Sequence, residues 1–181
     1  MLYDNVKDTT VQLLKPIAEE LIRTHDDSFL KDFNLKWKEA KMCIDMIRDI
    51  LLYMNKNFVP KYNLPLVENM QYSQFKHHVI LNSTLKKRLI SLLMQEIKME
   101  RDGSVIDKSQ IRSAIQMLIE VNKSSRKLYE QEFETILLQE TVEYYRLESF
   151  KLISDHPCSS YLEKAHTRLL EEFERNSNYL S

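Results

Sequence analysis

Apolar residues along most of the chain recur three and four positions apart, which is the spacing of one face of an α-helix. The most regular run lies between Leu35 and Phe58, where we predict one helix with a complete buried stripe. That stripe consists of Trp37, Ala40, Ile44, Ile47, Leu51, Met54 and Phe58. Similar spacing from Leu2 to Leu21 predicts a first helix that is kinked or broken at Pro16, because proline lacks the amide donor of a helix interior.

Turn-forming residues divide the rest of the pattern into further helices. The helices predicted after the first cover residues 28–34, 35–58, 67–81, 84–101, 108–121, 128–156 and 158–179. Pro60 and Pro65 mark the clearest internal boundary, since a proline cannot continue a helix. Gly103 predicts a left-handed helix stop, and Asp107 with Gln110 reads as a capping box that starts the next helix. The pattern indicates an all-α fold of about eight helices.

Composition supports this architecture and narrows the function. The chain has 181 residues with one glycine and four prolines, so a β-rich fold with many hairpins is excluded. The predicted helix over 128–156 would be roughly 43 Å long, which favours an elongated helical-repeat rod over a sphere. The 26 basic residues nearly cancel the 27 acidic ones, so we expect neither nucleic acid nor a membrane surface as partner.

Location and redox state follow from what the sequence lacks. The N-terminal segment mixes charged with apolar residues, unlike a signal peptide, and no stretch approaches the ~18 apolar residues of a membrane span. Cys43 and Cys158 are far apart and form no CxxC motif, which fits reduced thiols. We therefore expect a cytoplasmic and nuclear protein.

Candidate catalytic and metal-binding residues are few. His77 and His78 are adjacent, so on a helix they point about 100° apart and cannot easily share one metal. His156, Cys158 and His166 form the next candidate cluster, but Pro157 interrupts the helix between them. A single glycine excludes a glycine-rich phosphate loop. We predict no catalytic residue, no cofactor and no metal.

The helix predicted over 35–58 carries a second line of residues beside its buried stripe. This line contains Cys43, Met46, Ile50, Tyr53 and Asn57, with Asp49 and Lys56 at its edges. One interpretation is that the line packs against a neighbouring helix of the same bundle. The other is a partner-binding face, because a tyrosine among methionine and isoleucine with a charged rim is typical of interface anchors. The spacing alone leaves both open.

Several motifs together resemble the N-terminal helical-repeat region of cullins, closest to the cullins that bind BTB-domain adaptors. The first is the segment 46–54, with the sequence MIRDILLYM, which is similar to the fifth helix of the first cullin repeat. The second runs from Glu100 to Leu118 around Gly103 and resembles a helix pair of the second repeat. Further matches are Tyr129, Phe133, Glu134, Leu138, Thr141, Tyr144, Tyr145, Glu148, Ser149, Tyr161, Leu162, Arg168, Leu169, Glu171, Glu172 and Arg175.

The resemblance implies a non-catalytic scaffold of a cullin-RING ubiquitin ligase. In that family an N-terminal rod holds a substrate adaptor, and a distant C-terminal domain recruits the RING subunit. By resemblance, the partner-binding residues for a BTB-domain adaptor are Met46, Asp49, Ile50, Tyr53, Lys56 and Asn57. Lys56 stands where the family has an arginine, and its ammonium keeps the charge but cannot make the bidentate hydrogen bonds of a planar guanidinium. The alternative is a helical tether or trafficking-complex scaffold unrelated to ubiquitin.

The resemblance also implies a division of the chain. Residues 1–59 correspond to the last three helices of a first cullin repeat, 60–66 to a linker, and 67–181 to the second repeat. The first two helices of repeat one, the third repeat and the RING-binding domain have no counterpart here, so we do not expect this fragment to bind the RING subunit. We also expect an open apolar surface on residues 1–58, since an incomplete repeat leaves apolar stripes uncovered.

Overall fold

The computed structural model describes residues 2–122, 125–155 and 158–180, and every regular element within them is helical. In chain order these elements are α1 (Leu2–Arg23), α2 (Asp26–Ile50), α3 (Leu52–Lys61), α4 (Val67–Phe75), η1 (Lys76–Ile80), α5 (Ser83–Arg101), α6 (Lys108–Glu120), α7 (Lys127–Tyr129), η2 (Glu130–Glu134), α8 (Thr135–Asp155), α9 (Cys158–Arg175) and η3 (Asn176–Leu180). The η segments are short π-helical turns. They extend α4, join α7 to α8 and extend α9, so the described part of the chain forms eight helical rods.

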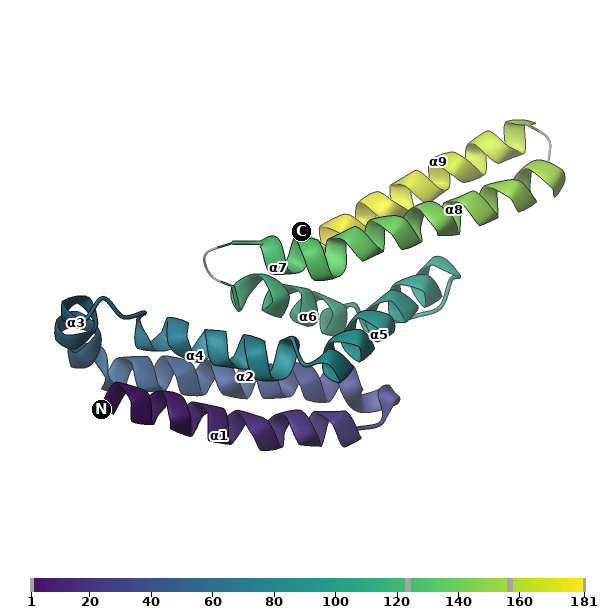
Figure 1. The fold of residues 1–181 in the computed structure, drawn as a ribbon. Helices are drawn as coiled ribbons and strands as arrows, with labels where there is room; N and C mark the ends of the chain where they lie inside the picture. Colours follow the sequence, from purple (N-terminus) through teal and green to yellow (C-terminus); the bar gives the residue numbers. More distant parts are fainter. Residues whose placement is uncertain (1, 123–124, 156–157, 181) are drawn as a thin grey trace.

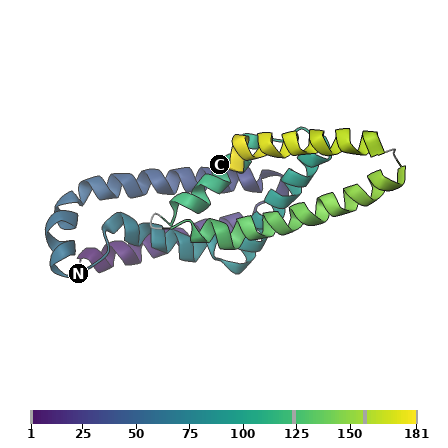
Figure 2. The ribbon, with the colours of Figure 1, turned by 90° about the horizontal axis from the view of Figure 1, so that it is seen from above.

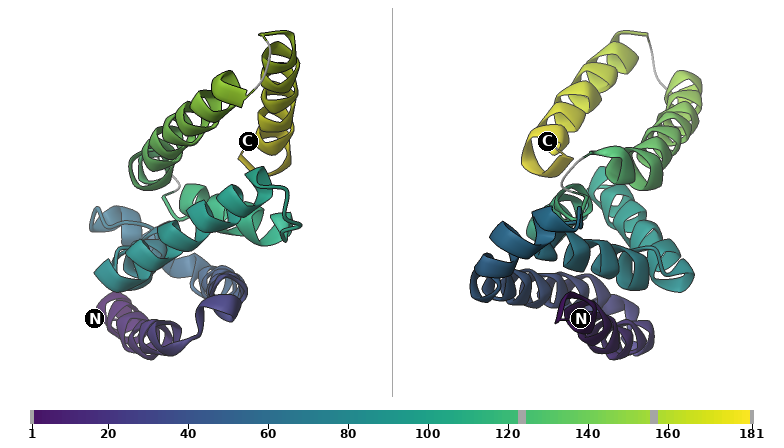
Figure 3. Two further views of the ribbon diagram at one scale, coloured as in Figure 1. Left: turned by 90° about the vertical axis from the view of Figure 1, so that its right-hand side faces the viewer. Right: turned by 60° about the vertical axis from the view of Figure 1, so that its left-hand side comes forward.

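The helices form an elongated molecule with two parts (Figure 1). α1, α2 and α4 pack against one another as an N-terminal three-helix group, and α3 turns across the end of that group (Figures 1 and 2). α8 and α9 form a hairpin that extends away from this group, and α5 lies between the two parts (Figure 3). The predicted all-α, elongated helical fold is therefore confirmed.

One large hydrophobic core connects nearly all of these helices. Trp37 of α2 lies at its N-terminal side, with ring centroids 5.8 Å from Tyr72 and 5.1 Å from Phe75 of α4. The same core continues through α5 and α6 to Phe133 and to Tyr179 of η3. Apolar packing thus crosses the segment 60–66, and the assignment of cullin repeats to either side of it stays a prediction.

The helix boundaries in the first third of the chain differ from the prediction. A single helix, α2, covers the region predicted as 28–34 plus most of 35–58, and a new helix begins after Leu51. α1 runs through Pro16 without a break. Gln12 and Pro16 both lie on the exposed side of α1, where water can hydrogen-bond the carbonyl that Pro16 leaves without a donor.

The later boundaries follow the prediction closely. Helical structure covers 67–80, 83–101 and 108–120, where 67–81, 84–101 and 108–121 were predicted. The predicted break within 122–125 falls partly on residues 123–124, and the predicted helix end at His156 and break at Pro157 also lie outside the described residues.

Two left-handed residues end helices in the same way. Gly103 (φ +92°) follows α5, and Asn63 (φ +50°) follows α3. After α5, the Gly103 amide donates to Glu100 and the Ser104 amide to the Met99 carbonyl (3.0 and 2.9 Å), which is the Schellman pattern. Asp107 then caps α6 by accepting from the Ser109 amide (3.0 Å). The predicted stop and cap are confirmed.

Gly103→Ala tests the helix stop. No heavy atom lies within 4 Å of the position that a Cβ would take, so steric clash with neighbours contributes nothing. The left-handed backbone alone should lower the free energy of unfolding by about 1 kcal/mol, measured by urea denaturation. Ser104→Ala serves as the control because Ser104 uses its backbone amide in the turn. An unchanged stability of Gly103→Ala would contradict the role assigned to this residue.

A buried polar network joins the end of α5 to the base of the α8–α9 hairpin. Arg101, only 4% exposed, donates from Nε to Glu172 Oε1 of α9 (2.8 Å) and from Nη2 to Thr141 Oγ1 of α8 (2.7 Å). Arg175 donates to Glu172 as well (2.8 Å). Burial acts to raise the pKa of Glu172, but hydrogen bonds from Arg101 and then Tyr145 outweigh it, and the pKa lies below its ordinary value. Glu172 is therefore ionised and holds both arginines.

Apolar side chains are exposed at both ends of the molecule. The expected open surface on residues 1–58 is present, and the hairpin carries a comparable one that the sequence did not predict. Exposed large apolar residues of the first segment are Leu2, Leu13, Ile22, Leu35, Met42, Met46, Ile50, Leu52 and Tyr53. Those of the hairpin are Leu138, Val142, Leu147, Phe150, Ile153, Leu162, Leu169, Leu170 and Phe173.

Candidate partner-binding surface

The six predicted partner-binding residues all lie on one exposed region at the junction of α2 and α3. We call this region the α2–α3 surface, and it consists of Met46, Asp49, Ile50, Tyr53, Lys56 and Asn57. Met46 is 58%, Ile50 76% and Tyr53 80% exposed, so no helix in the described part of the chain packs on them. Within the described residues, the second line therefore does not pack against a neighbouring helix.

The surface is divided between two helices, where a single helix was predicted. Leu51 (φ −96°, ψ 21°) ends α2, and its amide still donates to the Ile47 carbonyl (2.9 Å). Met46, Asp49 and Ile50 belong to the last turns of α2, whereas Tyr53, Lys56 and Asn57 belong to α3. The four residues Ile50 to Tyr53 span the bend, so the two groups remain neighbours along the chain.

A small second core holds α3 in its bent position. Met54 and Val59 of α3 pack with Tyr3 of α1 and with Val67 and Met70 of α4. The Tyr3 hydroxyl also donates to the Pro65 carbonyl (2.8 Å). Since Met54 and Val59 face inward, Tyr53 and Lys56 on the other side of the short helix face solvent.

Asn55 fixes α3 to the start of α4. It is 8% exposed, accepts the Val67 amide on Oδ1 (2.9 Å) and donates from Nδ2 to Glu68 Oε2 (2.9 Å). The Val67 amide is one of the donors at the start of α4 that have no partner within the helix. One buried amide therefore caps α4 and sets the direction of α3.

Asn55→Ala is expected to destabilise the protein by about 2 kcal/mol, because it leaves the buried Val67 amide and the Glu68 carboxylate without their partner. Chemical denaturation measures the change. Asn69→Ala, on the exposed side of α4, is the matched control and should leave the unfolding midpoint unchanged. Equal midpoints for the two variants would show that Asn55 does not anchor α3.

Charges at the edge of the α2–α3 surface are mixed. Arg48 donates from Nε to Asp49 Oδ1 (3.0 Å) and from Nη1 to Asp45 Oδ1 (2.8 Å), and the hydrogen bond to Asp49 is the main reason that the pKa of Arg48 is raised. No carboxylate among the described residues pairs with Lys56. Asp49 is thus already neutralised, and Lys56 offers a positive charge to a partner.

Two apolar neighbours belong to the same region and were missed. Met42 (59% exposed) lies one turn before Met46, and Leu52 (47% exposed) lies beside Tyr53. The spacing of Met42 from Met46 could have indicated it, since residues four apart share a helix face. Leu52 could not be found this way, because its exposure depends on the bend at Leu51.

Metal-binding clusters and membrane-spanning helices are both absent from the described residues. No group of three or more histidine, cysteine, aspartate or glutamate side chains could hold a metal within 2–122, 125–155 and 158–180, and His156 falls outside these ranges. Both cysteines are exposed and unpaired. No helix of the described chain is apolar over a length sufficient to cross a lipid bilayer.

Comparison with known proteins identifies the family. The model of the cullin alpha solenoid domain matches residues 1–181. The chain belongs to the cullin family. It is 37% identical over 180 residues to Cullin-3 of Dictyostelium discoideum, covering 99% of this chain and 23% of that cullin. Identity to Cullin-3B of Arabidopsis thaliana is 32% over 179 residues, covering 99% of this chain and 24% of that cullin.

A further cullin relative is shorter. Cullin-like protein 3 of Arabidopsis thaliana is 26% identical over 180 residues, which are 99% of this chain and 70% of that protein. The chain therefore spans about a quarter of the length of the two longer cullins it matches. The resemblance inferred from the MIRDILLYM segment and from the residues around Gly103 is confirmed at the level of the family.

Proposed function

We propose that this cullin-family chain is a non-catalytic scaffold of a ubiquitin ligase and that its α2–α3 surface binds a BTB-domain adaptor. The observation that supports the proposal most is Tyr53, which is 80% exposed between exposed methionine and isoleucine side chains. Aromatic residues within an apolar patch with a charged rim are the usual anchors of protein interfaces. The scaffold positions substrate in ubiquitin-dependent protein catabolism and contributes no reacting group.

The rest of the structure suits such a role. α3 is short and is held by a core and a buried amide rather than by a long helix, so the surface has a defined shape before a partner arrives. Preorganisation of this kind lowers the entropy lost on binding. We propose that the assembly works in the cytoplasm and nucleus and that this part of the scaffold does not contact the RING subunit.

Co-elution in size-exclusion chromatography tests the proposal. The purified 181-residue chain and a purified BTB-domain adaptor should elute together, and the peak should separate into its components when Ile50 is replaced by glutamate. Ile22→Glu, at an exposed apolar position of α1, is the control and should leave the complex intact. Separate elution of the unmodified proteins would favour a helical tether unrelated to ubiquitin.

A further inference from the structure

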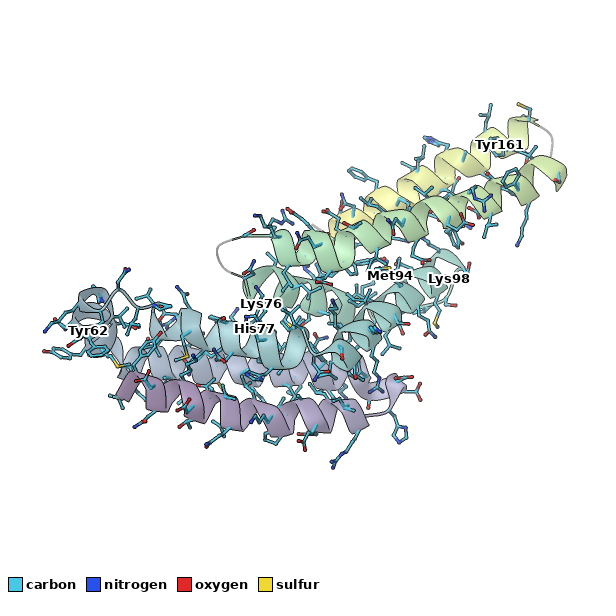
Figure 4. All side chains as sticks on the ribbon, in the orientation of Figure 1. Tyr62, Lys76, His77, Met94, Lys98 and Tyr161 are labelled. Carbon is cyan, nitrogen blue, oxygen red and sulfur yellow. The ribbon has the colours of Figure 1, made fainter. Side chains whose placement is uncertain are left out.

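A groove separates α5 from α8 on the side of the molecule away from the α2–α3 surface. Its volume is about 1170 Å³, above that of most ligand pockets, and its lining residues run along α5 from Lys86 to Arg101, which suits a long occupant. The floor is apolar and consists of Ile90, Met94, Ile97, Ile136 and Leu147. Figure 4 labels Met94 and Lys98 on α5, along the space between that helix and α8.

Polar contacts join the two walls of the groove at both of its ends and so fix the distance between them. At one end Lys86 Nζ pairs with Glu132 Oε2 (2.9 Å), and at the other the Tyr144 hydroxyl donates to Asp102 Oδ1 (2.9 Å). Burial and the bond to Asp102 raise the pKa of Tyr144 to about 12, so its hydroxyl stays protonated and donates at neutral pH. Arg168 of α9 adds a bond to the Arg101 carbonyl (3.1 Å). The groove is therefore preformed.

The two rims of the groove carry opposite charge. α5 contributes the exposed lysines Lys87 and Lys98, for which no ion pair occurs among the described residues. α8 contributes Glu140 and Glu143 over its first half, of which Glu143 pairs with Arg146 on its own helix (2.6 Å), and Lys151 near its end. Since the titratable groups lie at the rims and the ends while the floor is apolar, the groove suits docking rather than catalysis.

We infer that this groove binds an amphipathic α-helix of a partner protein. That helix has an apolar stripe for the floor, acidic residues on the edge beside α5 and basic residues on the edge beside α8. Ile90, Met94 and Ile97 are spaced four and three apart along one side of α5. Ile90 and Ile97 are 8% and 2% exposed, so Met94 between them and Leu147 of α8, which is 50% exposed, offer the apolar contact for a third helix. The opposite rims fix how the helix lies, because like charges against either rim are unfavourable. The inference does not rest on adaptor binding.

Three helical peptides of about 18 residues, roughly five turns, test this site by fluorescence anisotropy on the 181-residue chain. They share one leucine stripe and differ in their edges: one has an acidic and a basic edge, one has two acidic edges, and one has two basic edges. The mixed peptide should bind about tenfold more tightly than either of the others. Hydrogen exchange should show protection of α5 and α8 when it binds.

Variants of the chain make the test specific. Lys87→Glu with Lys98→Glu makes both rims acidic and should shift the preference to the peptide with two basic edges. Lys7→Glu with Lys38→Glu changes the same charge at exposed lysines elsewhere and should keep the preference for the mixed peptide. Equal affinity for all three peptides, protection outside the groove, or no binding of the mixed peptide would each overturn the inference.

Discussion

Tyr53→Ala is expected to weaken binding of a BTB-domain adaptor about 30-fold, or about 2 kcal/mol, which is the loss typical of an aromatic interface anchor. The side chain is 80% exposed in the free chain, so its removal leaves no cavity and should not lower stability. The Asn57 side chain donates to the Tyr53 carbonyl, a contact that the substitution keeps (2.9 Å). Isothermal titration calorimetry with a purified adaptor measures the affinity.

Two matched variants separate the contribution of the aromatic ring from other effects. Tyr53→Phe keeps the ring and should retain most of the affinity. Tyr62→Ala removes a tyrosine side chain from the turn after α3 (Figure 4), where its ring lies against Phe58 with centroids 4.5 Å apart and planes tilted by 39°. This variant should bind the adaptor normally. If Tyr62→Ala loses as much affinity as Tyr53→Ala, the contact does not depend on the α2–α3 surface as defined.

Arg101→Met is expected to lower the free energy of unfolding by about 3 kcal/mol and the melting temperature by roughly 10 °C. The guanidinium is 4% exposed and joins α5 to Glu172 of α9 and Thr141 of α8. It also lies 5.4 and 5.6 Å from the ring centroids of Tyr144 and Tyr145. Removing Arg101 leaves the Glu172 carboxylate with Arg175 as its arginine partner and breaks the buried link from α5 to both α8 and α9, which is the source of the large effect. Thermal denaturation measures it.

Arg146→Met is the control for Arg101→Met. Arg146 lies on the same hairpin and forms an equally close pair with Glu143 (2.6 and 2.8 Å), but both side chains are exposed. Water already solvates that pair, so the unfolding transition should not move measurably. Equal destabilisation by the two substitutions would contradict the role of burial. Adaptor affinity should stay the same in both variants, because the α2–α3 surface belongs to the other end of the molecule.

Signals that act within a few residues predicted the structure well. Gly103 and Asp107 gave a helix stop and a cap that the backbone conformation and the Ser109 hydrogen bond bear out. Both depend on local geometry. The stop needs one residue in the left-handed conformation, and the cap needs one side chain close to the unpaired amides at the start of a helix. The reciprocal half of the capping box is replaced by a distant contact, since Gln110 Oε1 accepts from Asn34 of α2 (2.8 Å).

The bend at Leu51 could not be predicted from the sequence. No glycine or proline marks it, and the apolar spacing continues through it from Trp37 to Phe58. The bend exists because Met54 and Val59 reach a core formed with Tyr3, Val67 and Met70, and because Asn55 binds the start of α4. These partners come from distant parts of the chain, so tertiary packing overrides the local pattern.

The sequence could predict which residues belong to the α2–α3 surface, but it could not predict the shape of that surface. The second apolar line identified Met46, Ile50 and Tyr53, and their exposure agrees with a surface position. The spacing gave no means to decide between burial in the bundle and exposure, because that depends on which helices are neighbours. For the same reason the spacing in α8 and α9 could not show that many of their apolar side chains are exposed.

Hydrogen exchange of the chain with and without a BTB-domain adaptor tests the central proposal most directly. We expect slower exchange on adaptor binding in residues 42–57, which contain the last turns of α2 and the start of α3, with little change in α8 and α9. The Tyr53→Ala variant should lose this protection at the same adaptor concentration. Adaptor binding that leaves residues 42–57 unchanged and protects another helix would contradict the proposal.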